Sequence, residues 1–280
     1  MQDAETVLAV LRERGRKGLP LTQLYRQMFN PAMYLLAYGN IYSNQGAMTP
    51  GACGETADGM SEGMISEITG LMRFERYRFA PARRVYIPKK NGKLRPLGIP
   101  SWRDKLTGEV VRLILEAIYE PVFSSRSHGF RKGRGCHTAL RQVRDAWTGT
   151  VWFIEGDIAD CYGSVDHEIL MQILGEKIGD QRFLRLIRGM LRAGYLEDWE
   201  FKDALSGCPQ GGLCATAHNP PCGVPRSRCC KVPSGRASGA ASQRRTYSTA
   251  HGRSVTAWIA LTARSHGMVS NDTPPYYVLR

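Results

Sequence analysis

Long apolar runs are absent from this sequence of 280 residues. A membrane-spanning helix needs roughly 18 to 20 consecutive apolar residues, and no segment approaches that length. The start, Met1-Gln2-Asp3-Ala4-Glu5, lacks the basic and then apolar pattern of a signal peptide. We therefore expect a protein without a membrane partner that works in the cytoplasm.

Paired cysteines are absent too. The eight cysteines form no C-x-x-C pair and no matching histidine spacing accompanies them, which argues against a zinc module. Without a secretory signal a disulfide framework is not expected, so we interpret them as free thiols in a reducing compartment. They are Cys53, Cys136, Cys161, Cys208, Cys214, Cys222, Cys229 and Cys230.

Acidic residues are scarce near the C-terminus. Residues 214–280 hold nine basic residues and one acidic residue, Asp272, whereas residues 1–213 hold 29 basic and 24 acidic residues. The tail contains no glutamate and has no periodicity beyond a short apolar patch at 255–261. We predict that residues 214–280 are largely disordered, because they offer little apolar surface to bury.

The rest of the chain has the composition of a folded protein with a polyanionic partner. Hydrophobic residues make up 42% of the sequence, which is enough for packed cores. The net charge is +13 and the isoelectric point is near 9.6. Nucleic acid is the commonest polyanionic partner of such a basic chain. Apolar periodicity predicts N-terminal helices broken at Asn30-Pro31 and further helices at 60–72, 106–119, 166–178 and 181–191.

A basic hairpin is predicted between residues 83 and 100. Two β-type runs flank Asn91-Gly92, the strongest short-range hairpin signal. Its cations either contact phosphate or simply protect a solvated edge strand. They are Arg83, Arg84, Lys89, Lys90, Lys93 and Arg95.

A second basic segment, HGFRKGRG at 128–135, precedes a helix that starts near Cys136. It lacks the Gly-Lys-Ser/Thr ending of a Walker loop. Arg131, Lys132 and Arg134 could bring guanidinium and ammonium groups to a nucleic-acid phosphate. A basic surface turn is the competing interpretation.

The segment WFIEGDIADCYGSVDH, at 152–167, contains the candidate catalytic residue. Period-2 alternation predicts a strand that delivers Asp157 at the end of its open face. Asp160 and Asp166 have a structural interpretation as well: aspartate is favoured in turns and at the N-caps of helices, and both residues could serve there rather than in a functional site. In the later turn GCPQGG, Gln210 could hydrogen-bond a ligand, or the turn could be an ordinary loop.

Taken in order, these motifs resemble the reverse transcriptases of group II intron-encoded proteins, from about Leu21 to Gly212. The resemblance rests on LYRQMFNPAMYLLAY, RRVYIPKKNGKLRPLGIPSWRDK, EPVFSSRSHGFRKGRGCHTAL, GDIADCYGSVDH and GCPQGG. It implies an α+β right-hand polymerase fold, with fingers and a partial palm built of an antiparallel sheet with helices. The domains implied are an N-terminal helical extension at 1–50, fingers at 51–148, a partial palm at 149–213 and the tail at 214–280.

The resemblance also implies roles at the nucleotide site. Asp157 matches the first catalytic aspartate, and the carbonyl of Ile158 matches its neighbouring Mg²⁺ contact. Tyr162 matches the residue that tells deoxyribose from ribose, and Gln210 matches a contact to the incoming dNTP. Two Mg²⁺ ions held by shared carboxylates would stabilise the attacking and leaving oxygens of nucleotide addition. The other nucleotide-binding residues implied are Lys93, Arg95, Ala159, Asp160 and Cys161.

One family motif is missing after the GCPQGG turn. No YxDD sequence, which would complete the metal site, follows Gly212. The similar run Tyr195-Leu196-Glu197-Asp198 comes before that turn, so we do not expect it to be catalytic. The abrupt change near residue 213 suggests the hypothesis of a shifted reading frame.

We therefore predict a reverse transcriptase (RNA-directed DNA polymerase) fragment that is polymerase-inactive, with intron RNA and an RNA/DNA template-primer as partners. The alternative is a non-catalytic, maturase-like module that binds intron RNA through its basic surfaces. A third hypothesis is a chain that does not fold stably, because a severed palm sheet exposes an edge. The sequence predicts no oligomeric state.

Overall fold

The computed structural model describes residues 2–44, 46–88, 92, 94–149, 163, 165–204 and 206–207, and the backbone of two short strands at 152–154 and 259–261. The chain divides into two compact units, 1–122 with 162–230 and 123–161 with 231–280. Within the described part of the chain, no helix is long and apolar enough to cross a membrane.

The α-helices of the first unit begin at residues with a strong capping preference. The side chains of Asp3, Asn30, Ser61, Ser101, Asp166 and Asp180 each accept a hydrogen bond from a backbone N–H in the first turn of the following helix. Such caps satisfy amides that otherwise have no partner. The helices are α1 (Ala4–Arg16), α2 (Pro31–Ile41), α3 (Glu62–Arg73), α4 (Trp102–Tyr119), α6 (His167–Gly175) and α7 (Gln181–Leu191), with 3-10 turns at Tyr25–Phe29, Ala57–Gly59 and Glu120–Val122.

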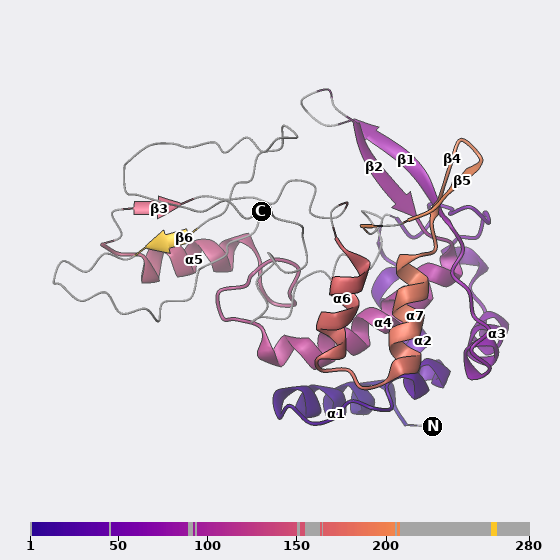
Figure 1. The fold of residues 1–280 in the computed structure, drawn as a ribbon, viewed down its shortest axis with the longest axis horizontal. Coiled ribbons are helices and arrows are strands. Elements are labelled where there is room, and N and C mark those ends of the chain that lie inside the picture. The colour runs from indigo at the N-terminus through magenta and orange to yellow at the C-terminus, as the bar shows by residue number, and fades with distance from the viewer. Residues whose placement is uncertain are drawn as a thin grey trace. The chain divides into compact units, whose positions relative to one another are not determined.

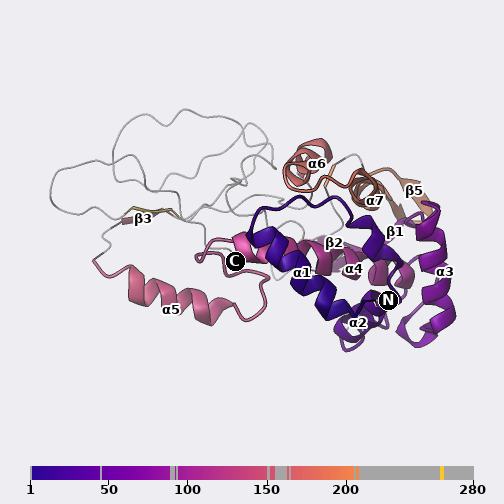
Figure 2. The ribbon, with the colours of Figure 1, turned by 90° about the horizontal axis from the view of Figure 1, so that it is seen from below.

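Helix α4 forms the centre of the first unit. Most of its residues are buried, including Trp102 and Leu106, which have no exposed surface. Helices α1 and α2 pack against it, as Figures 1 and 2 show. A Cβ atom on Gly15 of α1 would lie 2.3 Å from the carbonyl oxygen of Ile118. Glycine at this position therefore allows the two helices to approach closely.

A four-stranded mixed sheet lies in the same unit, in the order β2-β1-β4-β5. Strands β1 (Ala82–Pro88) and β2 (Leu94–Ile99) form the hairpin predicted around Asn91-Gly92, with Pro88 opposite Leu94. Strand β4 (Tyr195–Glu197) pairs with β1 in parallel and with β5 (Glu200–Lys202) in an antiparallel ladder. The sheet is thus not purely antiparallel as predicted, because one long-range pairing is parallel.

The second unit contains helix α5 (Cys136–Ala146) and a two-stranded antiparallel sheet of β3 (Trp152–Ile154) and β6 (Ile259–Leu261). Helix α5 starts where the sequence predicts it. Strand β3 is the first part of the predicted strand at 152–158. The rest of that strand lies outside the described residues. Residues 214–280, which were predicted to be disordered, also lie outside them apart from β6.

The other sequence predictions for the first unit hold with two differences. Helices α3, α4, α6 and α7 fall within about two to four residues of their predicted bounds. Helix α1 lies within the helical extension predicted at 1–50, but the sequence analysis gave it no bounds of its own. The stripe of Leu21, Leu24 and Met28 is buried as expected, but it forms only a 3-10 turn. The N–H of Tyr25 donates to the Asp180 carboxylate at 2.8 Å, and Asn30 caps α2, so the chain turns before an α-helix can extend.

Candidate nucleic-acid interface

Most residues of the implied nucleotide site lie outside the described part of the chain. These are Lys93, Asp157, Ile158, Ala159, Asp160, Cys161, Tyr162 and Gln210, and the same holds for Lys89 and Lys90, which were predicted to contact nucleic acid. Among the described residues there is no group of three or more His, Cys, Asp or Glu side chains that could hold a metal ion. The two described cysteines, Cys53 and Cys136, are free and exposed.

The predicted cations of the β1–β2 hairpin divide between its two faces. Residues opposite each other in an antiparallel ladder share a face, and alternate residues change face. Arg83 lies opposite Ile99 and Arg95 lies opposite Ile87, which places Arg83 and Arg95 on one face and Arg84 on the other. Arg95 is exposed, whereas Arg83 donates two hydrogen bonds to the carbonyl oxygen of Pro50 at 2.8 and 3.2 Å. Arg95 is therefore available to a ligand, and Arg83 anchors the hairpin.

The third hairpin cation, Arg84, packs on the β4–β5 hairpin. Its guanidinium carbon lies 3.4 Å from the ring centroid of Tyr195, a cation–π contact. The Tyr86 hydroxyl donates to the Glu197 carboxylate, which raises the pKa of that tyrosine. Asp198 and Trp199 make the turn with φ of 51° and 67°. The run Tyr195–Asp198 thus packs against strand β1 and supports the β1–β2 hairpin.

The basic loop of the second unit uses part of its charge internally. Arg131 is only 9% exposed, donates to the carbonyl oxygens of Ser124 and Ser127 at 2.7 and 2.8 Å, and lies 5.2 Å from the ring of Phe123. Arg134 donates to the carbonyl oxygen of Ser125 at 2.6 Å. Lys132 is exposed. The hydrogen bonds of Arg131 therefore stabilise the conformation of the loop, whereas the side chain of Lys132 faces solvent. Phosphate binding by the loop stays a prediction.

A buried polar network fixes the chain where it enters β1. The Asp104 carboxylate accepts hydrogen bonds from the Tyr77 hydroxyl at 2.8 Å, from the Ser101 hydroxyl at 2.7 Å and from the N–H of Ala80 at 3.0 Å. Burial raises the pKa of Asp104 and raises that of Tyr77. Residues 77–80 are therefore tied to the first turn of α4.

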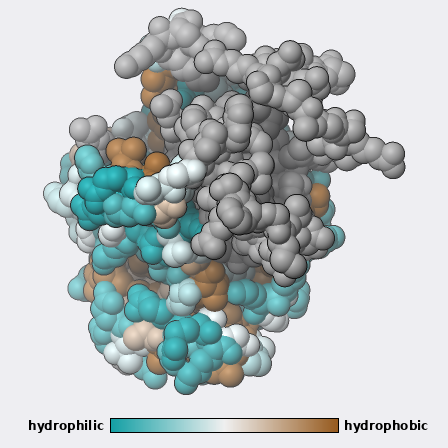
Figure 3. All heavy atoms as spheres, turned by 90° about the vertical axis from the view of Figure 1, so that its left-hand side faces the viewer, coloured by the Kyte–Doolittle hydropathy of each residue, from teal (hydrophilic) through white to brown (hydrophobic). Residues whose placement is uncertain are grey.

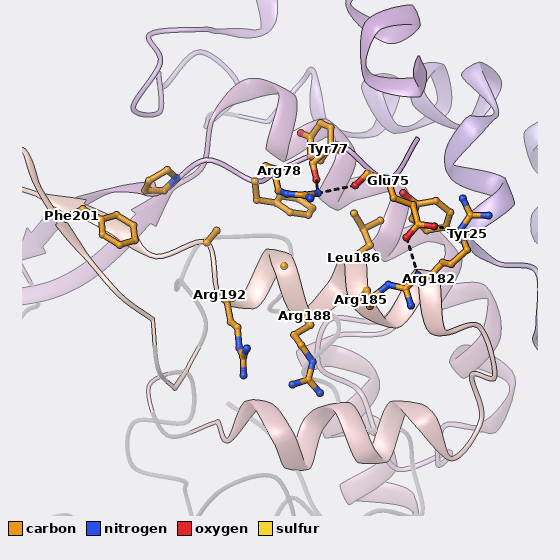
Figure 4. Close-up of a pocket in the computed structure, with 14 residues that line it drawn as sticks. Tyr25, Glu75, Tyr77, Arg78, Arg182, Arg185, Leu186, Arg188, Arg192 and Phe201 are labelled. Carbon is orange, nitrogen blue, oxygen red and sulfur yellow. Dashed lines mark hydrogen bonds and ion pairs between the residues drawn. The ribbon is translucent and has the colours of Figure 1, made fainter. Parts of the chain in front are cut away.

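Next to this network lies a cavity of ≈ 670 Å³ along helix α7 (Figure 4). Arginines at three- to four-residue spacing put a row of cations on the exposed side of the helix, opposite buried Phe183 and Ile187. The row consists of Arg182, Arg185, Arg188 and Arg192, and Arg78 joins it from the segment before β1. Sequence reasoning used only the apolar stripe of this helix and missed the arginines, although their spacing was the available signal.

Comparison with known proteins identifies the family to which the motifs around these elements are similar. Residues 87–218 match the family model described as reverse transcriptase (RNA-dependent DNA polymerase). Over 193 residues the chain is 49% identical to the group II intron-encoded protein LtrA of Lactococcus lactis subsp. cremoris. The matched part of the chain belongs to the group II intron reverse transcriptases. The α+β class predicted for it is confirmed by helices that pack with a mixed sheet.

Other relatives of this reverse transcriptase segment have similar coverage. The match to LtrA covers 69% of the chain and 32% of LtrA, so the chain spans about a third of that relative. A protein described as an uncharacterized 91 kDa protein in the cob intron of Schizosaccharomyces pombe is 47% identical over 191 residues, covering 68% of the chain and 24% of that protein. A chain of a partial Cas6-RT-Cas1–Cas2 complex is 18% identical with a TM-score of 0.44, covering 70% of this chain and 33% of that one.

Proposed function

We propose that this chain binds RNA as the fingers and partial palm of a group II intron reverse transcriptase, and that it does not extend a primer by itself. The observation that carries the proposal is the match of residues 87–218 to reverse transcriptases. The net charge of +13 and the exposed Arg95 and Lys132 support an RNA partner. The RNA proposed is intron RNA, alone or as a template paired with a DNA primer.

The proposed nucleotide site combines residues from the hairpin and from the motifs after β3. The carboxylate of Asp157 and the carbonyl of Ile158 would hold a divalent metal, which we propose is Mg²⁺. Arg95 and Lys93 would neutralise the triphosphate of a dNTP, Tyr162 would contact its sugar, and Gln210 would bind the nucleotide. The remaining contacts proposed are the backbone amides of Ala159, Asp160 and Cys161.

The proposed lack of DNA synthesis rests on the sequence after the GCPQGG turn. A bound pair of metal ions would stabilise charge on the attacking and leaving oxygens, and this requires carboxylates from more than one segment. No YxDD sequence follows Gly212 to supply them. Asp198 does not replace them, because it makes the turn of the β4–β5 hairpin.

Primer extension on a poly(rA) template with an oligo(dT) primer tests this proposal. We expect the full chain to incorporate no more dTTP than the Asp157→Asn variant. An RNA-binding measurement on the same preparations shows whether the chain is competent to hold the template. Incorporation by the unmodified chain that disappears in Asp157→Asn would overturn the proposed lack of polymerisation.

A second candidate is a maturase-like module that binds intron RNA without any nucleotide site. The observation that favours it is the concentration of arginines along α7, which line a cavity that does not include Arg95. A test with labelled dTTP separates the two candidates. Binding of dTTP that is lost in Arg95→Gln supports the nucleotide site, and no dTTP binding with intact RNA binding supports the maturase-like module.

A further inference from the structure

The α7 cavity has an excess of positive charge that its carboxylates do not cancel. Arg182 and Arg185 contact the Glu75 carboxylate at 2.7 and 2.8 Å, and Arg188 and Arg192 contact Glu168 at 2.5 and 3.0 Å. Arg78 donates to the backbone carbonyls of Glu75 and Tyr77. Four guanidinium groups thus share two carboxylates in this cluster, and Arg78 adds a fifth positive charge.

The arginines remain accessible although each one has a partner. The side chains of Arg185 and Arg192 are 61% and 58% exposed. The side chain of Arg182 is 43% exposed, although its Nε atom is itself buried, 2.7 Å from Glu75 Oε1. A guanidinium group carries five N–H donors, so one carboxylate contact leaves others for a second anion.

The spacing of the row indicates a ligand with several anionic groups. Arg182 and Arg192 are ten residues apart, which corresponds to about 15 Å along a helix. A single phosphate cannot contact guanidinium groups spread over that length. A chain of phosphates can, and guanidinium groups bind phosphate with good geometry.

Aromatic side chains at the cavity indicate that the ligand carries bases. Phe201 of β5 lines the cavity and is 54% exposed. Phe79 also lines the cavity and is half-buried. The Phe201 ring rests against Gly194, where a Cβ would lie 2.6 Å from the ring atom Cε2. Gly194 has φ of 73°, so the close approach that holds the ring depends on glycine. Figure 4 shows Phe201, Arg192 and Arg188 following one another along the cavity.

From this geometry we propose that the α7 cavity is a binding site for single-stranded nucleic acid, separate from the implied nucleotide site. The arginine row contacts successive phosphates, and Phe201 stacks on a base. Single strands fit better than duplexes because only unpaired bases offer their faces to an aromatic ring. This proposal rests on the proposed function in one respect, namely that the chain binds nucleic acid. It does not depend on the implied nucleotide site or on polymerase activity.

The phosphate contacts are tested with a triple variant, Arg185→Gln, Arg188→Gln and Arg192→Gln. The probes are a fluorescent oligouridylate and an oligothymidylate of about 12 nucleotides, within the usual range of site sizes. We expect about tenfold weaker binding and a salt slope of log K that is smaller by roughly 2, since each single-strand phosphate contact contributes about 0.7. The two probes show whether the site prefers RNA or DNA, and loss on either one supports it.

A matched control removes the same charge elsewhere. Arg12, Lys17 and Arg144 are exposed on α1, after α1 and on α5, and their replacement by glutamine lowers the net charge equally. Equal loss of binding in both triple variants would overturn the site, because net charge alone would then explain it. A second variant, Arg185→Lys, Arg188→Lys and Arg192→Lys, keeps the charge but not the planar guanidinium group, so it should restore the salt slope and only part of the affinity. A salt slope that stays as low as in the glutamine variant, with the lysine variant folded by circular dichroism, counts against phosphate binding.

The stacking contact is tested with Phe201→Ala, using Phe201→Trp as the conservative variant. Loss of one base–aromatic stack weakens binding by roughly tenfold. We expect that loss for the oligonucleotides but not for inorganic polyphosphate, and we expect Phe201→Trp to bind normally. An equal effect on polyphosphate would refute the nucleic-acid assignment. These outcomes do not depend on primer extension, so the failure of either proposal is recognised separately.

Discussion

Two buried tyrosines in the first unit differ in whether their hydroxyl group has a partner. The Tyr77 hydroxyl donates to Asp104, whereas the Tyr119 hydroxyl is buried without a hydrogen-bond partner among the described residues. We expect Tyr77→Phe to lower the free energy of unfolding by about 1–3 kcal/mol, because it removes a bond to a buried acid. Tyr119→Phe should not destabilise the protein. Urea denaturation measures both, and equal destabilisation by the two variants would contradict this account.

Glu75 gives the protein a predictable response to acid. Its hydrogen bond to Arg185, with the nearby charge of Arg182, lowers its pKa below the ordinary value of 4.5. A group with a lowered folded-state pKa stabilises the fold above its unfolded pKa and loses that contribution as the pH falls through the folded value. We therefore expect Glu75→Gln to flatten the fall in unfolding free energy below about pH 5. Glu62→Gln, at an exposed position of α3, is the control; identical acid responses of both variants and the unmodified chain would refute the prediction.

Helix packing distinguishes two glycines that look alike in the sequence. Gly15 of α1 faces the backbone of α4, whereas Gly39 of α2 has no atom within 4 Å of its would-be Cβ. We expect Gly15→Ala to destabilise the protein by about 1–3 kcal/mol through the clash with Ile118. Gly39→Ala should stabilise it by up to about 1 kcal/mol, because alanine favours an exposed helix position. Thermal melting of both variants decides, and a stabilising Gly15→Ala would contradict the packing described for α1 and α4.

At the scale of elements, the sequence predicted the helices and the hairpin whose formation depends on residues close together in the chain. The Asn91-Gly92 turn and the apolar stripes of α3, α4, α6 and α7 were sufficient for those elements. The pairing of β1 with β4 was not predictable, since it joins residues more than a hundred positions apart. The exposed row on α7 was missed because a polar helix face carries no packing signal, and its meaning depends on the cavity formed with residues 75–81 and Phe201.

At the scale of the whole molecule, exposed cations are the feature of the described surface that the proposed RNA partner would contact. Hydrophobic side chains occur in small groups between hydrophilic ones on the face seen in Figure 3. Family resemblance predicted the reverse transcriptase segment and named Asp157 and Tyr162. Both lie outside the described residues, so their roles remain predictions. The described cations divide instead between anchoring contacts, as for Arg83 and Arg131, and exposed positions, as for Arg95 and Arg185.

The salt dependence of RNA binding by the full chain tests the central claim most directly. Phosphate contacts release counterions, so log K for a labelled intron RNA should fall linearly with log salt concentration. With six or more contacts, we expect the affinity to fall by about a thousandfold between roughly 50 and 200 mM salt. RNA binding that does not change over this range, or no binding at the lower salt concentration, would contradict the account of this chain as an RNA-binding segment of a reverse transcriptase.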